Sequence, residues 1–298
     1  MANLKDVRDK IASTLSTQQI TQAMKMVSAA KLRRAQTAIT QMRPYEQKLY
    51  AIFANILASG GGGGSASAFA AQRPVENACM VVVTSNRGLA GAFNANIIKA
   101  AVQTIESQYA VPRQKGKLTI ICIGKKGYDY FRRKYADCKV VGDYVNLFAK
   151  LDFGQSTDVS KLLMESFSMK KFDSVSVAYS RFKNAAMQFA ESVQILPVTS
   201  AAQAPGAGSK MKADYLFEPD VDTLLEMLTP AILQTQFYKF LLDTHASEHG
   251  ARMTSMDKAT DNAQELLKTY RINYNKARQE AITKELSEIV GGAAALES

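Results

Sequence analysis

Residues Ala263–Val290 read AQELLKTYRINYNKARQEAITKELSEIV, a stretch without Gly or Pro. Apolar or small residues recur in it with alternating steps of four and three, the spacing of a helix face that packs against another helix. The stripe consists of Ala263, Leu267, Tyr270, Tyr274, Ala277 and Ala281, and it resumes one residue displaced with Ile282, Leu286, Ile289, Ala293 and Leu296. The pattern predicts a long, narrow coiled-coil helix at the end of the chain.

The helical pattern extends far upstream of this stretch. Residues 231–290 contain no Pro and a single Gly, Gly250. Pro is favoured in the first turn of a helix, so Pro230 is well placed to open this one. A helix of such length lacks enough local stabilisation of its own, and its apolar stripe therefore needs a partner.

The beginning of the chain has the matching pattern. Residues 1–59 contain no Gly, and Pro44 is their only Pro, so a helix of about 40 residues, roughly 60 Å, can form before a kink. Its apolar positions step by three and four with two slips of five: Leu4, Val7, Ile11, Leu15, Ile20, Met24, Val27, Leu32, Ala35, Ile39 and Met42. We expect the two terminal helices to pair in an antiparallel coiled coil.

Between the termini the pattern changes to short apolar runs that read as strands. These runs are Ala78–Ser85, Lys117–Lys125, Cys138–Val141, Phe172–Phe182 and Ala185–Val198. Helical segments are expected between several of them, at Phe93–Gln108, Tyr128–Lys134 and Ser160–Lys170. This order predicts a mainly parallel, Rossmann-like α/β domain with a hairpin near its end, and the fold class α/β.

These patterns divide the chain into five segments. We expect an N-terminal coiled-coil helix (1–59), a flexible Gly/Ser linker (60–77), a central α/β domain (78–200), a second linker with a foot segment (201–219) and a C-terminal coiled-coil helix (220–298). Residues 49–72 carry no charge, but five consecutive glycines, Gly60–Gly64, suit a linker better than a membrane span. No transmembrane segment is expected.

Charge and cysteine content narrow the class of protein. The chain of 298 residues has a formal net charge of +10. The first 50 residues hold nine Lys or Arg against three Asp or Glu, whereas Val221–Ser298 holds eight against eleven. The three cysteines show no CxxC spacing, which indicates a reducing compartment without a disulfide framework or zinc site. The first residues lack the pattern of a signal or transit peptide, so we expect no export.

Two patterns suggest enzymatic sites, and both are incomplete. Residues Thr84–Ile97, TSNRGLAGAFNANI, follow a strand and lead into a helix, but they fit neither common phosphate-binding spacing, and Pro205–Lys210 fails as well. The segment His245–His249 has the order H-x-x-E-H of one class of zinc protease. The chain has no further histidine, so a structural pair is favoured over a metal site. We expect no catalytic residue, cofactor or metal.

The first helix is basic around Lys25, Lys31, Arg33 and Arg34. Such a cluster can contact phosphates of nucleic acid, but no aromatic residue interleaves it. A cationic helix beside an apolar seam equally suits docking between protein subunits. We favour the protein partner and expect no nucleic acid.

Five stretches together resemble the gamma subunit of F-type ATP synthases, in the same order from the first helix to the last residues. They are Thr17–Gln36, Thr84–Ile97, Asp214–Asp220, Ser247–Leu267 and Tyr274–Leu296. The resemblance implies a central rotor shaft, with two antiparallel helices entering a ring of alpha and beta subunits. Rotation of a membrane ring then drives the beta-subunit sites through ATP synthesis, and this chain itself is non-catalytic.

The resemblance also implies roles for particular residues. Met24 and Lys25 would contact the beta subunits, as would Arg278, Gln279 and Thr283 as a polar catch. Tyr215 and Glu218 would lie at the end that meets the epsilon subunit and the membrane ring of c subunits. The apolar bearing tip would consist of Ile282, Leu286, Ile289 and Leu296.

The expected location is the cytoplasmic face of a bacterial inner membrane, as a peripheral protein, with the mitochondrial matrix face as the second choice. Two other classes compete with the rotor interpretation. One is a stand-alone α/β enzyme with helical arms, which should bind a small ligand when isolated. The other is a coiled-coil adaptor, which should associate without a nucleotide-hydrolysing partner.

Overall fold

The computed structural model describes residues 4–58, 69, 71–198, 218 and 221–296. The chain divides into two compact units, one of Met1–Ser28 with Arg252–Ser298 and the other of Ala29–Ala251. We call them the helix-pair unit and the sheet unit. Helices α1 (Leu4–Ala58) and α7 (Val221–Leu296) each contribute residues to both units.

Both terminal helices are confirmed, but neither proline acts as the sequence pattern predicts. Helix α1 continues through Pro44, and α7 begins at Val221 and contains Pro230 in its interior. A proline inside a helix removes one hydrogen bond and crowds the preceding turn, so neighbouring contacts must compensate. Buried residues stand close to both prolines, Glu46 and Leu49 on α1 and Ile232 and Leu233 on α7.

The sheet unit is built on a five-stranded sheet in the order β3-β2-β1-β4-β5. Its strands are β1 (Ala78–Val83), β2 (Leu118–Ile123), β3 (Lys139–Val141), β4 (Ser174–Phe182) and β5 (Gln188–Leu196). The pairs β1–β2, β1–β4 and β2–β3 are parallel, and β4–β5 is antiparallel. The expected parallel α/β sheet with a terminal hairpin is confirmed.

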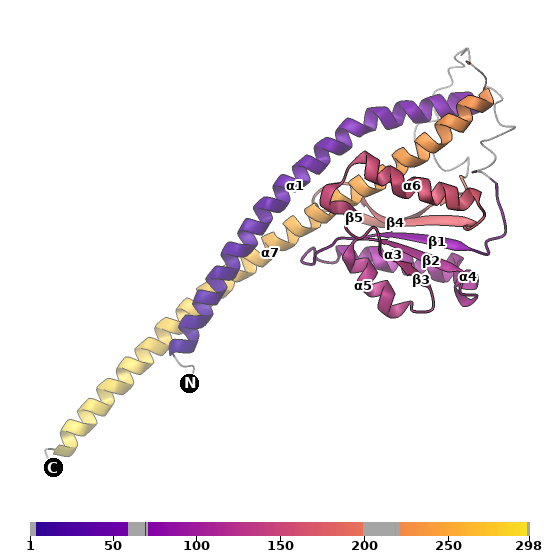
Figure 1. Cartoon of the computed structure of the whole chain (residues 1–298). Helices are drawn as coiled ribbons and strands as arrows, with labels where there is room; N and C mark the ends of the chain where they lie inside the picture. Colours follow the sequence, from indigo (N-terminus) through magenta and orange to yellow (C-terminus); the bar gives the residue numbers. More distant parts are fainter. Residues whose placement is uncertain (1–3, 59–68, 70, 199–217, 219–220, 297–298) are drawn as a thin grey trace. The chain divides into compact units, whose positions relative to one another are not determined.

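Helices cover both faces of this sheet (Figure 1). One face packs against α3 (Phe93–Gln108) and α5 (Lys125–Lys134), with the short α4 (Ala110–Gln114) following α3. The other face packs against α6 (Phe153–Ser168) and the part of α7 that carries Leu233, Phe237 and Leu241. A short 3-10 helix, Leu147–Lys150, precedes α6 in the chain. Every residue of β1 is fully buried between the two layers, as its uninterrupted apolar sequence predicts.

Two helices begin earlier than the sequence pattern predicts. Helix α5 begins at Lys125 and α6 at Phe153, whereas the pattern placed their first residues at Tyr128 and Ser160. Asp152 caps α6, because its carboxylate accepts a hydrogen bond from the Gln155 amide at 2.8 Å. Among the described residues, no helix is long and apolar enough to cross a membrane.

Candidate functional site

The helix-pair unit contains most of the predicted site residues, and cross-helix contacts set its register. Arg8 donates a hydrogen bond to the Tyr274 hydroxyl at 3.1 Å, Thr260 donates to the Thr21 hydroxyl at 2.8 Å, and Lys25 pairs with Asp257 at 2.5 Å. The two residue numbers of each pair sum to 281 or 282. The two helices therefore run antiparallel, and their register does not shift between these contacts. The expected antiparallel pairing is confirmed.

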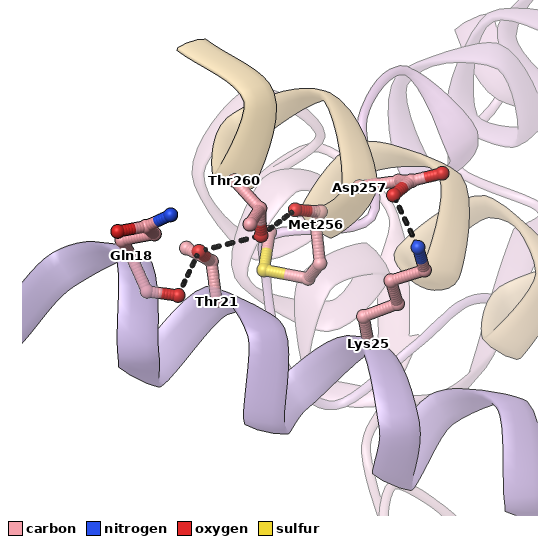
Figure 2. Close-up of polar contacts among 6 residues, drawn as sticks. All are labelled: Gln18, Thr21, Lys25, Met256, Asp257 and Thr260. Atoms are coloured by element: carbon pink, nitrogen blue, oxygen red, sulfur yellow. Dashed lines mark hydrogen bonds and ion pairs between the residues drawn. The ribbon is translucent and has the colours of Figure 1, made fainter. Parts of the chain in front are cut away.

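The middle of this pairing is polar (Figure 2). The Thr260 hydroxyl lies 2.8 Å from both the Thr21 hydroxyl and the Met256 carbonyl, and the Thr21 hydroxyl lies 3.0 Å from the Gln18 carbonyl. Thr21 accepts from Thr260 and donates to the Gln18 carbonyl, whereas the single hydroxyl proton of Thr260 has two acceptors, the Thr21 hydroxyl and the Met256 carbonyl. One turn further along α1, Lys25 reaches the carboxylate of Asp257.

This polar centre corrects the apolar seam expected for α1. Ile20 and Val27 were expected in the seam, but they are 59% and 57% exposed, whereas Thr21 and Ser28 are buried. The buried and half-buried residues of α1 keep steps of three and four because they include polar residues, so the two predicted slips of five do not occur. The sequence reading missed this because it followed apolar residues alone. It also missed the exposed apolar surface on α1 formed by Ile20, Met26 and Val27.

The register determines where α7 leaves its partner. Pairs that sum to about 282 bring Leu4, the first described residue of α1, level with Arg278 of α7. Helix α7 continues to Leu296. Its apolar residues beyond that level are exposed: Ile282 by 49%, Leu286 by 61% and Ile289 by 71%. Their spacing of four and three places them on one helix face.

The polar residues predicted for the catch lie at the start of this extension. Arg278 and Gln279 are exposed, and the Thr283 hydroxyl donates to the Gln279 carbonyl at 2.9 Å. Gln279 and Thr283 are four residues apart and lie on one helix face. Arg278 lies on the neighbouring face, together with Ile282 and Leu286. The structure thus brings polar and apolar candidates together on adjacent faces of one helix.

The α1 candidates lie about six turns away along the pair. Met24 is half-buried, and the Lys25 side chain is 42% exposed despite its ion pair. The hydrogen bond to Asp257 raises the pKa of Lys25, so the ammonium charge is firmly held near neutral pH. At the other end of the pairing, the Arg8 guanidinium lowers the pKa of the Tyr274 hydroxyl.

Three other predicted residues are less informative. Glu218 is exposed. Tyr215 lies outside the described residues, as does the Gly60–Gly64 run. Leu296 belongs to α7, but its side chain lies outside the described part of the structure.

The loop after β1 uses its polar groups internally. The Ser85 amide donates to the Asn94 side chain at 3.0 Å, and the amides of Lys125 and Gly127 donate to the side chains of Asn86 and Thr84 at 2.9 Å each. A phosphate-binding loop needs such amides to point at its ligand. Here the Ser85 amide binds a side-chain oxygen, and the Thr84 and Asn86 side chains of the same motif accept hydrogen bonds from amides at the start of α5.

The H-x-x-E-H segment lies in α7, within the sheet unit. The Nε2 atoms of His245 and His249 are 3.2 Å apart, and the His245 ring stacks on Phe148 with ring centres 5.8 Å apart. His249 is buried. In the part of the chain that the structure describes, no group of three or more His, Cys, Asp or Glu side chains is arranged to hold a metal.

The cysteines are not reactive groups in this fold. Cys79 and Cys122 are buried in adjacent strands, and burial raises the pKa of Cys122 to about 12. Burial also raises the pKa of Cys138, to about 11, and of Cys79. Thiols with pKa values this high carry almost no thiolate at neutral pH.

Comparison with known proteins gives one consistent result. The family model described as ATP synthase matches residues 3–296. The chain is 48% identical to the ATP synthase gamma chain of Cytophaga hutchinsonii, over 99% of both chains. Its fold is similar to chains in two structures of the Euglena gracilis mitochondrial ATP synthase. One, of OSCP, F1 and c-ring in rotational state 3, has a TM-score of 0.65 and 23% identity and covers 98% of this chain and 94% of that chain. The other, of the rotor in rotational state 1, has a TM-score of 0.62 and 22% identity. It covers 94% of this chain and 98% of that chain.

Proposed function

Because the chain belongs to the family of ATP synthase gamma chains, we propose that the exposed end of its helix pair turns inside the catalytic subunits as a bearing. The chain is a non-catalytic subunit of the central stalk of an F-type ATP synthase. As the rotor, it couples rotation of the membrane ring to the conformational cycle of the catalytic subunits. It is a peripheral part of a membrane-bound complex.

The observation that carries the bearing proposal is the apolar stripe Ile282–Leu286–Ile289. These side chains are about half to three-quarters exposed on a helix that has passed the first described residue of α1. An exposed row of large apolar side chains on one helix face is typical of a contact with another protein. Apolar contacts are non-directional, so a surface of this kind resists sliding less than ion pairs do.

The polar candidates extend the same proposal. Arg278, Gln279 and Thr283 lie next to the apolar stripe and would form the catch against a beta subunit. Lys25 keeps nearly half of its side chain exposed, which leaves room for a second acidic partner besides Asp257. Met24 lies beside it on α1. In this proposal the five residues make contacts that form and break during each turn.

The remaining assignments concern the opposite end and the location. We assign Tyr215 and Glu218 to the end that meets the epsilon subunit and the c ring, and we keep the division into five segments proposed from the sequence. We place the complex at the cytoplasmic face of a bacterial inner membrane. The 48% identity to a bacterial relative supports this location over the mitochondrial matrix face.

The bearing proposal can be tested with two matched substitutions. Leu286→Asp places a charge in the stripe, and Val111→Asp places one at a similarly exposed apolar position of the sheet unit, 57% exposed against 61%. Burying an unpaired charge is unfavourable by several kcal/mol, so Leu286→Asp should lower ATP synthesis by the assembled complex at least about tenfold. Val111→Asp should leave it unchanged.

Four further results bear on the same proposal. Wild-type rates of ATP synthesis by the Leu286→Asp complex would contradict the bearing proposal. From native membranes, the chain is expected to copurify with alpha, beta and epsilon subunits and with ATPase activity.

Replacing Arg278 and Gln279 together by Ala should impair assembly or turnover. Removing Val290–Ser298 should weaken synthesis without abolishing it. Micromolar ATP binding by the isolated chain would favour the stand-alone enzyme instead.

A further inference from the structure

A carboxyl group is buried in the sheet unit where α7 meets α1 and the β4–β5 hairpin. Asp243 of α7 is only 6% exposed. Among the described residues, no hydrogen bond or ion pair reaches its carboxyl group within the usual distance limits. A largely buried carboxylate without a hydrogen-bond donor is unfavourable, because burial removes much of the water that solvates its charge.

Two of the cations around Asp243 are already paired with other carboxylates. Lys239, one turn earlier on α7, binds Glu46 of α1 at 2.5 Å. Arg181 of β4 binds Glu191 of β5 at 2.8 Å. The two pairs are different kinds of link, since Lys239–Glu46 connects the two long helices and Arg181–Glu191 lies within the hairpin.

The other groups near Asp243 complete its surroundings. Arg43 of α1 is exposed and acts on Asp243 through charge alone. Tyr179 of β4 is buried, with its ring centre 4.2 Å from that of Phe240. Burial is the largest cause of the raised pKa of Tyr179, with the charges of Glu191 and Asp243 adding to it, so this hydroxyl stays neutral.

We propose that Asp243 is a proton-controlled lock on the contact between α1 and α7. When Asp243 is protonated, Lys239 remains on Glu46 and the two helices stay joined at this point. When Asp243 loses its proton, the buried carboxylate competes with Glu46 for Lys239, and the link to α1 loosens. This inference goes beyond the stalk function and does not depend on the bearing proposal.

The direction of the pH effect follows from burial. Burial raises the pKa of Asp243 to about 7; Lys239, Arg43 and Arg181 oppose the rise, and Glu46 adds to it. A carboxyl whose pKa is higher in the folded than in the unfolded chain stabilises the fold at low pH. That contribution declines as the pH rises from the unfolded value of about 4 and is lost above the folded value. The contact should therefore be tightest in mildly acidic solution and weakest above pH 7.

The test compares the full chain with Asp243→Asn, which is neutral at every pH. For a folded pKa of about 7, the Asp243 carboxyl alone should raise the unfolding equilibrium constant of the wild type about tenfold between roughly pH 6 and 8. Asp243→Asn should lack that rise. Asp129→Asn, a half-buried position on α5, should keep it. Equal pH dependence in the wild type and Asp243→Asn would overturn the proposal.

A second measurement addresses the link itself. Hydrogen exchange of the α1 amides around Glu46, corrected for its intrinsic pH dependence, should be faster at high pH in the wild type and unaffected by pH in Asp243→Asn. Exchange without a pH effect in the wild type would overturn the role of the link. Should Asp243→Asn fail to fold, titration of the Asp243 carboxyl by NMR in the wild-type chain decides, and a pKa near the ordinary value of about 4 excludes the lock.

Discussion

The two units of this chain are stabilised in opposite ways. The sheet unit has a fully buried central strand and two apolar clusters, one on each face of the sheet. In the helix-pair unit, hydroxyl groups and an ion pair occupy the middle of the contact, and large apolar residues such as Ile282 and Leu286 are exposed. The first unit thus has an extensive apolar core of its own, whereas the second presents apolar residues in a row on one helix face, which other chains can bury.

This difference suits a rotor. A unit that must hold its shape under torque benefits from a core whose side chains interlock. A shaft benefits from contacts that can be exchanged, because strong fixed bonds to the surrounding subunits would stop it. Core residues of the sheet unit should therefore contribute to the stability of the isolated chain, and the exposed apolar residues of the helix-pair unit should contribute only in the complex.

The largest expected effect comes from truncating a core ring. Phe131 is fully buried, with ring centres 5.2 and 5.1 Å from those of Tyr130 and Tyr135. Phe131→Ala should lower the free energy of unfolding by about 3–5 kcal/mol, whereas Leu286→Ala in the isolated chain should change it by less than about 0.5 kcal/mol. Denaturant unfolding of both variants measures the difference. Similar losses would mean that the stripe is packed in the isolated chain.

The next effect concerns backbone packing in the sheet unit. Gly124 has a φ of 102°, and a Cβ there would lie 2.0 Å from the Thr84 carbonyl oxygen. Gly124→Ala should therefore destabilise the chain by roughly 3 kcal/mol or more. Gly116, with a φ of 67° and nothing within 4 Å of its Cβ position, is the matched control. Gly116→Ala should be unfavourable by about 1 kcal/mol only. Equal thermal midpoints for the two variants would show that the β1–α5 junction can move aside.

Much of the fold follows from periodicity in the sequence. The strands and the first α/β helix are predictable because buried parallel strands form uninterrupted apolar runs, as in Ala78–Val83, and because α3 has a clear helical period. The two predictions based on proline were wrong, because the tendency of proline to break a helix is local and can be outweighed by packing. The packing that lets Pro44 and Pro230 lie inside helices comes from residues far away in the sequence.

The candidate site was predictable to a smaller extent. The stripe from Ile282 to Ile289 stands out in the sequence, but its exposure depends on where α1 begins to pair, which only the register reveals. The polar centre of the helix pair was not predicted, because Thr21 and Lys25 are not apolar, although they keep the spacing of three and four. Asp243 could not be predicted from the sequence, because its burial arises only when α7 is packed in the folded sheet unit.

A smaller effect is expected from the polar seam. Thr21 and Thr260 bond each other, so replacing both by Val removes donor and acceptor together and leaves no orphaned partner across the seam. Thr21→Val with Thr260→Val should be neutral or raise the stability of the isolated chain by up to about 1 kcal/mol. The exposed Thr269→Val should have no effect within about 0.5 kcal/mol. A large loss in the double variant would show that the hydroxyls determine the pairing of the helices.

The smallest effect on stability should come from Lys25. Its ion pair with Asp257 is exposed on both sides, 42% and 47%, and such pairs are screened by salt and contribute little. The pKa of Lys25 is raised, so its contribution is complete below the ordinary lysine value and declines only in strongly alkaline solution, leaving no dependence between pH 6 and 8. Thermal unfolding of Lys25→Met at low salt and at about 1 M salt should differ little from that of the wild type. ATP synthesis by the assembled complex then separates two roles. A loss of synthesis without a loss of stability assigns Lys25 to a contact with another subunit, whereas parallel losses assign it to the seam between α1 and α7.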